Sequence, residues 1–251
     1  MRKTPLTKSR PSRVRLAGRR LVWPPGVPRS ARFEEFGRND NGLWGQFIHA
    51  RGRASISWSS EGTIFSERYF DAQGRAHGLE VSRHDDGTVQ WRVPWVRGQM
   101  HGLARQFDEA GRELVRTRFI RGSGIDLWVS GGFISELREH ENSQLHGVER
   151  WGHPLFPYEE NHYLRGRRAG ISRRWKGSTL EPGYPHYFVD DEEVSRAEYL
   201  RARKTRPELP AYRRQDDRRE RPMHDGLPHA WIRKDIRAHL MRMPTPEDGI
   251  D

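Results

Sequence analysis

The chain has 251 residues, of which 33% are hydrophobic, and a mean hydropathy of −0.97, so we expect a thin sheet instead of a thick multilayer core. The absence of cysteine excludes disulfides, thiolate metal sites and cysteine nucleophiles. No apolar run reaches the roughly 18 residues of a transmembrane helix, and the basic N-terminus lacks the apolar core of a secretory signal. We therefore expect a cytoplasmic protein without a transmembrane segment.

Residues 1–32 form the first predicted segment, a basic, proline-containing tail that we expect to be disordered. Lys and Arg total 45 against 34 Asp and Glu, for a net charge of +11. Ten of those basic residues and no acidic one lie in residues 1–32, so the rest of the chain is nearly neutral. One hypothesis is that the tail is an arm that binds nucleic acid or another acidic surface through its arginines, among them Arg10, Arg13, Arg15, Arg19 and Arg20. Contact with anionic lipid, and no role at all, are the alternatives.

Glycines recur at a near-constant interval along the middle of the chain. They stand at Gly78, Gly102, Gly124, Gly147 and Gly170, which are 24, 22, 23 and 23 residues apart. An aliphatic residue follows each glycine, and histidine precedes three of them. A second set of turn signals, such as Asp86-Gly87, alternates with the first and supplies the positive φ that a tight hairpin needs. This spacing predicts a chain of hairpins whose strands begin at structural repeat glycines.

Short runs of alternating polar and apolar residues join these turns. The run over residues 88–96 places four apolar side chains on one face: Val89, Trp91, Val93 and Trp95. Such alternation is typical of a half-buried strand. With a degenerate first copy near Gly52, about six hairpins extend over residues 45–177. We predict a mainly β fold, an elongated single-layer antiparallel meander over residues 33–178, with residues 33–47 as its N-terminal capping segment.

Residues 179–251 have a different pattern, which predicts a small α/β cap followed by a linker and a helix. Residues 187–189 are typical of a strand and residues 190–191 of a turn. Ser195 and Glu198 have the spacing of a capping box that opens a helix ending near residue 204. Residues 206–222 are polar and bounded by proline, as in a linker, and residues 229–243 have the apolar spacing of a final helix.

The repeated unit resembles a known family. Residues 95–102 read Trp-Val-Arg-Gly-Gln-Met-His-Gly, and residues 163–170 read Tyr-Leu-Arg-Gly-Arg-Arg-Ala-Gly. The pattern is similar to a MORN-type repeat, in particular to the bacterial MORN-variant proteins often labelled antitoxin components or YwqK-like. The resemblance covers roughly residues 45–177. It implies β-hairpin repeats that serve as scaffolds or binding surfaces for protein or lipid partners, and antitoxin-like sequestration of a protein is one form of that role.

The histidines and acidic pairs are candidates for metal or catalytic sites. His77 and His101 occupy equivalent places in adjacent hairpins, which puts them about 10 Å apart, too far to share one zinc ion. The pairs 85–86 and 190–191, both Asp-Asp, fall in predicted turns, where solvated turn formers are expected. No nucleophile or phosphate-loop motif is present. We therefore predict no metal, no cofactor and no catalytic residue, and expect the protein not to be an enzyme.

Tryptophans are the candidate partner-binding residues, because aromatic side chains concentrate at binding hot spots. They either pack one face of the sheet or form an exposed aromatic surface; the candidates are Trp91, Trp95, Trp128, Trp151 and Trp175. The leading hypothesis is a non-enzymatic repeat scaffold that binds a protein partner, whose identity the sequence does not give. A nucleic-acid-associated protein that uses the basic arm is the first alternative. An enzyme with a site between the sheet and the C-terminal region is the second.

Overall fold

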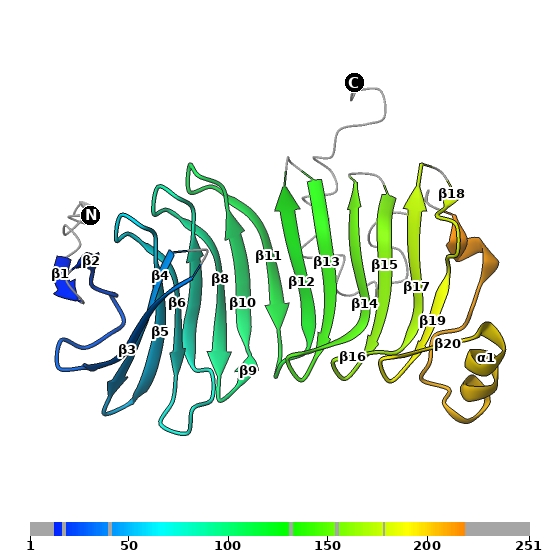
Figure 1. Cartoon of the computed structure of the whole chain (residues 1–251), viewed down its shortest axis with the longest axis horizontal. Helices are drawn as coiled ribbons and strands as arrows, with labels where there is room; N and C mark the ends of the chain where they lie inside the picture. The colour runs from blue at the N-terminus through cyan, green and yellow to red at the C-terminus, as the bar shows by residue number, and fades with distance from the viewer. Residues whose placement is uncertain are drawn as a thin grey trace, which may run out of the picture. The chain divides into compact units, whose positions relative to one another are not determined.

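The computed structural model describes residues 13–16, 19–39, 42–130, 133–153, 156–177 and 179–218. These residues form a mainly β protein of antiparallel strands with one α-helix, which confirms the predicted fold class at that level (Figure 1). The chain divides into two compact units, unit 1 with residues 1–97 and 109–111, and unit 2 with residues 98–108 and 112–251. Arg10 and the predicted helix over residues 229–243 lie outside the described residues. No helix in the described ranges has the length and apolarity needed to span a membrane.

Unit 1 contains a hairpin and a meander of six strands. The hairpin pairs β1 (Arg13–Leu16) with β2 (Arg19–Val22). In the meander each strand is antiparallel to the next: β3 (Arg32–Asn39), β4 (Gly42–His49), β5 (Gly52–Trp58), β6 (Ile64–Phe70), β7 (Gly78–Arg83) and β8 (Val89–Val96). Residues 33–39 and 42–47, predicted as part of a capping segment, thus belong to two full strands of the sheet.

The segment of residues 19–31, here called the N-terminal cover, packs on one face of the unit 1 sheet. Its Leu21, Val22 and Val27 are buried in one cluster with sheet residues that include Phe47, Ile56 and Trp58. The indole N–H of Trp58 donates to the carbonyl of Val22 at 2.8 Å. The structure therefore differs from the predicted disordered tail over residues 19–31. The apolar residues among the arginines bury enough surface to order the segment. The prediction of disorder took the charge of the segment into account but not this burial.

Unit 2 contains an open antiparallel sheet. Its central order is β12-β13-β14-β15-β17-β19-β20. These strands are β12 (Gly124–Ser130), β13 (Phe133–Glu141), β14 (Gln144–His153), β15 (Phe156–Leu164), β17 (Gly170–Lys176), β19 (His186–Val189) and β20 (Glu192–Val194). The short strands β16 (Arg167–Arg168) and β18 (Thr179–Leu180) pair with β15 and β17. The sheet therefore continues past residue 178, where the sequence predicts its end.

Three further strands of unit 2 precede that sheet: β9 (Gln99–Met100), β10 (Gly102–Phe107) and β11 (Glu113–Phe119). β10 pairs with β11, whereas β11 and β12 belong to different sheets. The buried side-chain amide of Gln106 in β10 donates to the carbonyl of Val129 at 2.7 Å and accepts from its N–H at 2.8 Å. A side chain thus replaces a strand at this edge of β12, so the predicted continuous single layer is interrupted here.

Five turns have two consecutive residues with positive φ, as in type I′ hairpin turns: residues 97–98, 121–122, 142–143, 165–166 and 190–191. At three of them the first N–H of the turn donates to Nδ1 of a repeat histidine: Arg97 to His77 (3.4 Å), Arg121 to His101 (3.2 Å) and Arg165 to His146 (3.3 Å). The histidine spacing therefore has a structural explanation, since each imidazole satisfies the N–H of a neighbouring turn.

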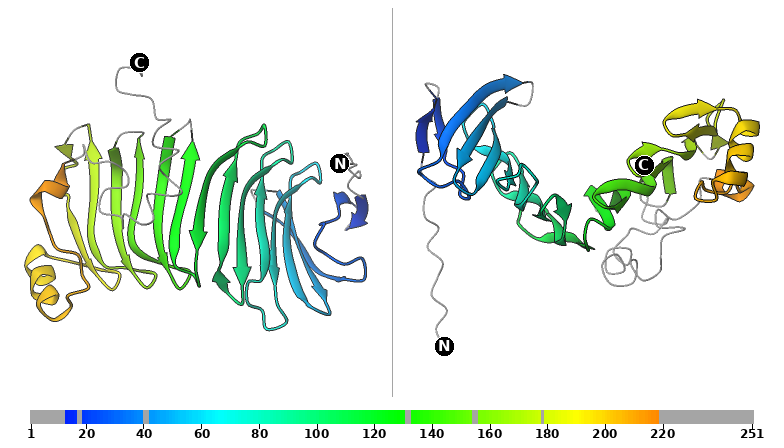
Figure 2. Two further views of the ribbon diagram at one scale, coloured as in Figure 1. Left: turned by 180° about the vertical axis from the view of Figure 1, so that it is seen from behind. Right: turned by 90° about the horizontal axis from the view of Figure 1, so that it is seen from below.

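Residues 195–217, here called the C-terminal cover, pack at the β17–β19 end of the unit 2 sheet (Figure 2). They include α1 (Arg196–Thr205) and the 3-10 helix η1 (Arg214–Asp217). The predicted capping box at the start of α1 is confirmed, because Ser195 and Glu198 each accept from the backbone N–H of the other. Tyr199 and Leu209 of the cover are buried against Ile171 and Tyr187 of the sheet.

Candidate functional site

The register of the unit 2 sheet places large aromatic and acidic side chains side by side. Residues that oppose each other directly in neighbouring strands share one face of a sheet. Trp128 opposes Glu136, and Glu136 opposes Trp151. Trp151 in turn opposes Glu159, and Glu159 opposes Arg174. We call these five residues the aromatic–acidic row, and the sheet face that carries them the polar face.

A second row runs beside the first on the same face, at a distance of two residues in each strand. It contains Asp126, Arg138, Glu149 and Asn161. The guanidinium of Arg138 donates from Nε to Glu149 at 3.0 Å and also pairs with Glu136 of the first row. The amide of Asn161 donates to Glu159 at 2.9 Å. Hydrogen bonds therefore connect the two rows into one network.

Burial changes the pKa values of the titratable groups on this face. It raises the pKa of Asp126 and that of Glu136, while the nearby guanidinium of Arg138 opposes both changes. It lowers the pKa of His140, on the same face, to about 4, so this imidazole is neutral at pH 7. Around Arg138 three carboxylates, those of Asp126, Glu136 and Glu149, thus face one guanidinium, a formal net charge of −2.

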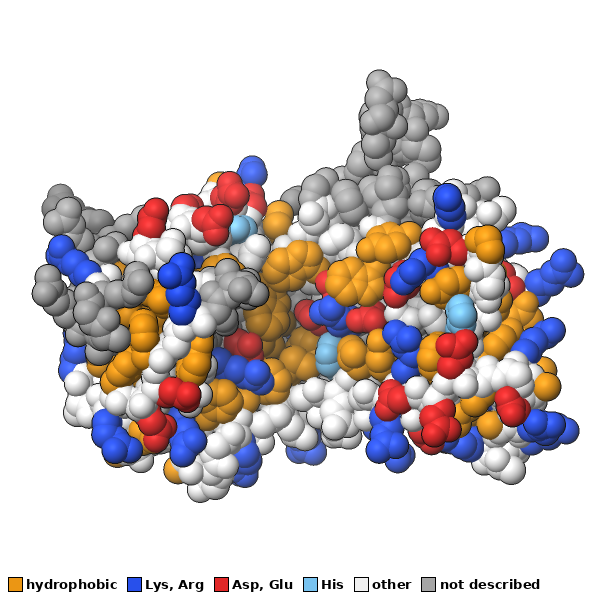
Figure 3. Space-filling model, viewed as in Figure 1, with side chains coloured by type: hydrophobic (Ala, Val, Ile, Leu, Met, Phe, Trp, Pro, Cys, Tyr) orange, Lys and Arg blue, Asp and Glu red, His pale blue; other side chains and the backbone are white. Residues whose placement is uncertain are grey.

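Aromatic side chains on the polar face are partly exposed. Trp128 and Trp151 are half-buried, and the Arg138 guanidinium lies 5.1 Å from the ring centre of Trp151. Tyr158 is 42% exposed, and its pKa is raised by burial and by the charges of Glu159 and Glu136. Figure 3 shows hydrophobic side chains interspersed with acidic and basic ones over the strands that carry both rows. This face therefore offers large apolar contacts next to fixed charges.

The opposite face of the same sheet is buried where the C-terminal cover packs on it. Arg150 pairs with Glu160 at 2.9 Å, and Arg173 pairs with Glu160 at 2.7 Å and with Asp217 of the C-terminal cover at 3.0 Å. Trp175 lies on this face, 4% exposed, and its indole N–H donates to the backbone carbonyl of Asp217 at 2.8 Å. The prediction of Trp175 as a partner-binding residue is therefore wrong, because its ring packs inside unit 2.

Trp91 and Trp95, the other predicted contact residues, lie in unit 1 on β8. Trp91 opposes Ser82, Trp95 opposes Gly78, and both rings are half-buried. The guanidinium of Arg68 lies 4.9 Å from the ring centre of Trp95. The five candidate tryptophans therefore do not form a single row: Trp91 and Trp95 share a face of β8 in unit 1, and Trp128 and Trp151 share the polar face of unit 2.

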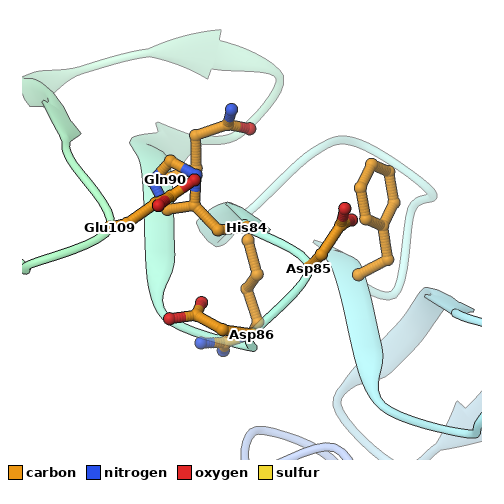
Figure 4. Close-up of a pocket in the computed structure, with 7 residues that line it drawn as sticks. His84, Asp85, Asp86, Gln90 and Glu109 are labelled. Atoms are coloured by element: carbon orange, nitrogen blue, oxygen red, sulfur yellow. The ribbon is translucent and has the colours of Figure 1, made fainter.

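The acidic turn of residues 84–88 borders a cavity of about 390 Å³ in unit 1 (Figure 4), lined by Phe65, Arg83, His84, Asp85, Asp86, Gln90 and Glu109. The carboxylates of Asp85 and Asp86 point away from each other in Figure 4. Asp86 accepts hydrogen bonds from the N–H and hydroxyl of Thr88, which lower the pKa of its carboxyl. Among the described residues no three His, Asp or Glu side chains form a metal-binding group. The two aspartates that the sequence pairs therefore do not converge in this cavity.

The predicted arm and the repeat glycines lie elsewhere. Arg13 and Arg15 fall in β1 and Arg19 and Arg20 in β2, where Arg15 opposes Arg20. Four of the five repeat glycines have positive φ: Gly78, Gly102, Gly147 and Gly170. Gly124 does not, but a Cβ there would lie 2.6 Å from the Phe119 ring, so glycine is required by close packing. The repeat glycines therefore shape the turns and strands of the fold.

Sequence reasoning missed the acidic half of the candidate site. The signal was present as alternation, since Glu136, Arg138 and His140 are spaced by two, as are Glu149 and Trp151. That spacing predicts a shared face within one strand. It does not predict which strand residues become opposed, because a one-residue change of register reverses the face.

Comparisons with known proteins assign no function to this site. Neither a protein-family model nor a curated protein matches this chain. The MORN-type resemblance of the repeats accordingly stays a prediction.

Proposed function

We propose that this protein is a non-catalytic scaffold, built of about six MORN-like hairpin repeats with a small C-terminal cap, that holds a protein partner on the polar face of the unit 2 sheet. Sequestration of the partner, as in an antitoxin, is one form of this function. The observation that carries the proposal is the pair of half-buried tryptophans, Trp128 and Trp151, next to exposed Tyr158. Large aromatic side chains at the centre of a surface are the usual anchors of protein–protein binding.

The polar face also has the rigidity that an anchor surface needs. The side chains of Glu136, Arg138 and Glu149 hold one another through ion pairs, and Arg138 in turn lies over the ring of Trp151. Groups that are already fixed lose less conformational freedom on binding, which favours affinity. A solvated strand face without a binding role has no need for two tryptophans and a tyrosine beside this network.

The test places a photo-crosslinking amino acid at position 128, at position 151 and, as a control outside both rows, at Leu200 on α1, which is 39% exposed and thus more exposed than either tryptophan. Crosslinking is done in the source cell, and the products are identified by mass spectrometry. We expect one and the same protein at positions 128 and 151 and its absence at position 200. That protein, purified, should bind the wild-type chain and lose about tenfold or more in affinity to Trp151→Ala. Unrelated products at the two positions, or undiminished binding to Trp151→Ala, would overturn the proposal.

A further inference from the structure

The charge around Arg138 is unbalanced. Arg138 forms ion pairs with Glu136 and Glu149, whereas in the described part of the chain Asp126 forms no such pair. Asp126 and Glu149 also act on Glu136 as like charges. Partly buried carboxylates in excess over cations are costly until they bind a proton, which their raised pKa values favour, or a cation is added. This corner of the polar face, which we call the acidic corner, therefore favours a second positive group from outside.

The two tryptophans flank that corner. Trp128 and Trp151 lie on the strands either side of Glu136, so their backbones are about 10 Å apart with the carboxylate between them. A cation over Glu136 would then be within about 6 Å of both rings, the distance at which cation–π attraction acts. Arg138 already lies 5.1 Å from the Trp151 ring, which shows that this ring accepts a guanidinium.

We propose that the acidic corner and its two tryptophans bind an arginine side chain of an extended partner segment. A guanidinium stacks on tryptophan and donates two parallel hydrogen bonds to a carboxylate, which a lysine ammonium cannot do. The inference rests on the proposed scaffold function and supplies the chemistry of the partner. The chain as a whole carries a charge of +11, so attraction of an arginine peptide is a local property of this corner and not of net charge.

The test uses three peptides of the form acetyl-Ser-Gly-X-Gly-Ser-amide, whose blocked ends carry no charge. X is arginine, lysine or citrulline, the neutral isostere of arginine. The full chain is titrated with each, and the indole N–H signals of Trp128 and Trp151 are followed by NMR after assignment with single Trp→Phe variants. We expect the arginine peptide to shift both signals with saturation. The lysine peptide should bind more weakly, and the citrulline peptide should leave both signals in place.

Two variants localise the effect. Glu136→Gln and Asp126→Asn should each weaken arginine-peptide binding about tenfold, the loss expected for one charge-assisted contact. The matched control Glu192→Gln, at an exposed site on β20 of the same unit, should bind as the wild type does. Citrulline or lysine peptides that bind as well as arginine, or acidic-corner variants that bind normally, would overturn the inference.

The two proposals fail in different ways. A protein crosslinked from positions 128 and 151, together with no response to the arginine peptide, would retain the scaffold and reject arginine recognition. Saturable arginine binding without any crosslinked protein would reject the scaffold function and retain the arginine site.

Discussion

Units 1 and 2 cover the apolar face of a sheet by different chemistry. In unit 1 the N-terminal cover buries Leu21, Val22 and Val27 in a cluster that is apolar throughout. In unit 2 the C-terminal cover adds an ion pair inside the buried face, because Arg173, 1% exposed, binds both Glu160 of β15 and Asp217 of the cover. One cover is thus held by apolar burial and by hydrogen bonds such as that from Trp58 to Val22, and the other is also held by charges that must all be paired.

This difference predicts how each cover responds to damage. When a buried apolar side chain is truncated, the loss of stability increases with the apolar surface removed and with the volume of the cavity left behind. A buried ion pair contributes little over an apolar replacement, but removing one partner leaves a buried charge unpaired. Single substitutions should therefore have their largest effect in unit 2, and amide hydrogen exchange should show each effect in its own unit.

The largest effect is expected for Glu160→Ala in unit 2. Glu160 is the shared partner of Arg150 and Arg173, so its removal leaves two buried guanidinium groups without this carboxylate. We expect a loss of about 3–5 kcal/mol in the free energy of unfolding. Urea denaturation gives the magnitude, and hydrogen exchange should show faster exchange in β14, β15 and β17.

An exposed ion pair of unit 2 serves as the control for this prediction. Arg112, whose side chain is 82% exposed, pairs with Asp108, and Arg112→Ala should cost less than about 1 kcal/mol. If Glu160→Ala cost no more than Arg112→Ala, the buried charges would not hold the C-terminal cover.

The next effect is expected in unit 1 for Leu21→Ala. Leu21 is 1% exposed, and truncating a buried leucine removes transfer free energy and leaves a cavity, so we expect a loss of about 3 kcal/mol. Exchange should increase in β4 and β5 while β14 and β15 keep their protection. Val96→Ala, at a side chain of the same unit that is 43% exposed, should change stability by less than about 0.5 kcal/mol. Equal losses for the two variants would show that the N-terminal cover is not packed on the sheet.

The same two covers show how far the fold was predictable from the sequence. The C-terminal cover was anticipated at Ser195 and Glu198, because a capping box is a local signal read over four residues. The N-terminal cover was not, since Leu21 and Val27 look isolated among arginines and gain their meaning only from Phe47 and Trp58, which come later in the chain. A signal contained in a few neighbouring residues was therefore predictable from the sequence, whereas burial between residues far apart in the chain was not.

The candidate site shows the same limit. Strand positions of Trp128 and Trp151 were predicted from alternation, and both residues lie on a partly exposed face. Trp175 was assigned by the same rule and is buried, because the cover that buries it begins some twenty residues later. The carboxylates of the polar face depend on register, which is set by bulges such as the one between Trp128 and Val129. No periodicity in the sequence marks that shift.

A smaller, pH-dependent effect is expected from His140 of unit 2. Burial lowers its pKa from the ordinary 6.5 to about 4; a hydrogen bond with the Arg138 backbone and the charge of Glu149 oppose this change, and the charge of the Arg138 guanidinium acts with it. Between these values the unfolded chain binds a proton that the folded chain does not, so the contribution of His140 to stability is lost as the pH falls from 6.5 to 4. The loss amounts to about 2–3 kcal/mol, since one pH unit corresponds to about 1.4 kcal/mol.

His140→Phe isolates this contribution, because it retains a ring against Phe119, which the imidazole contacts edge to face at 5.9 Å. The raised pKa values of Asp126, Glu136 and Glu139 act in the opposite direction and are common to both proteins. Urea denaturation at pH 7 and pH 4.5 should give a smaller pH-dependent loss for the variant than for the wild type. Parallel losses would mean that His140 is protonated in the folded state.

The smallest effect is expected for Ser195→Ala at the start of α1. Ser195 accepts the N–H of Glu198 through its hydroxyl, and an N-cap serine typically contributes about 1 kcal/mol. The loss should be confined to the first turn of α1 in hydrogen exchange, because Tyr199 remains buried and its hydroxyl still donates to the carbonyl of Pro210 at 2.7 Å. Ser195→Thr, which keeps the hydroxyl, is the matched control and should retain most of the stability. A loss of several kcal/mol for Ser195→Ala would mean that the cap, and not the buried side chains of the C-terminal cover, holds this end of unit 2 together.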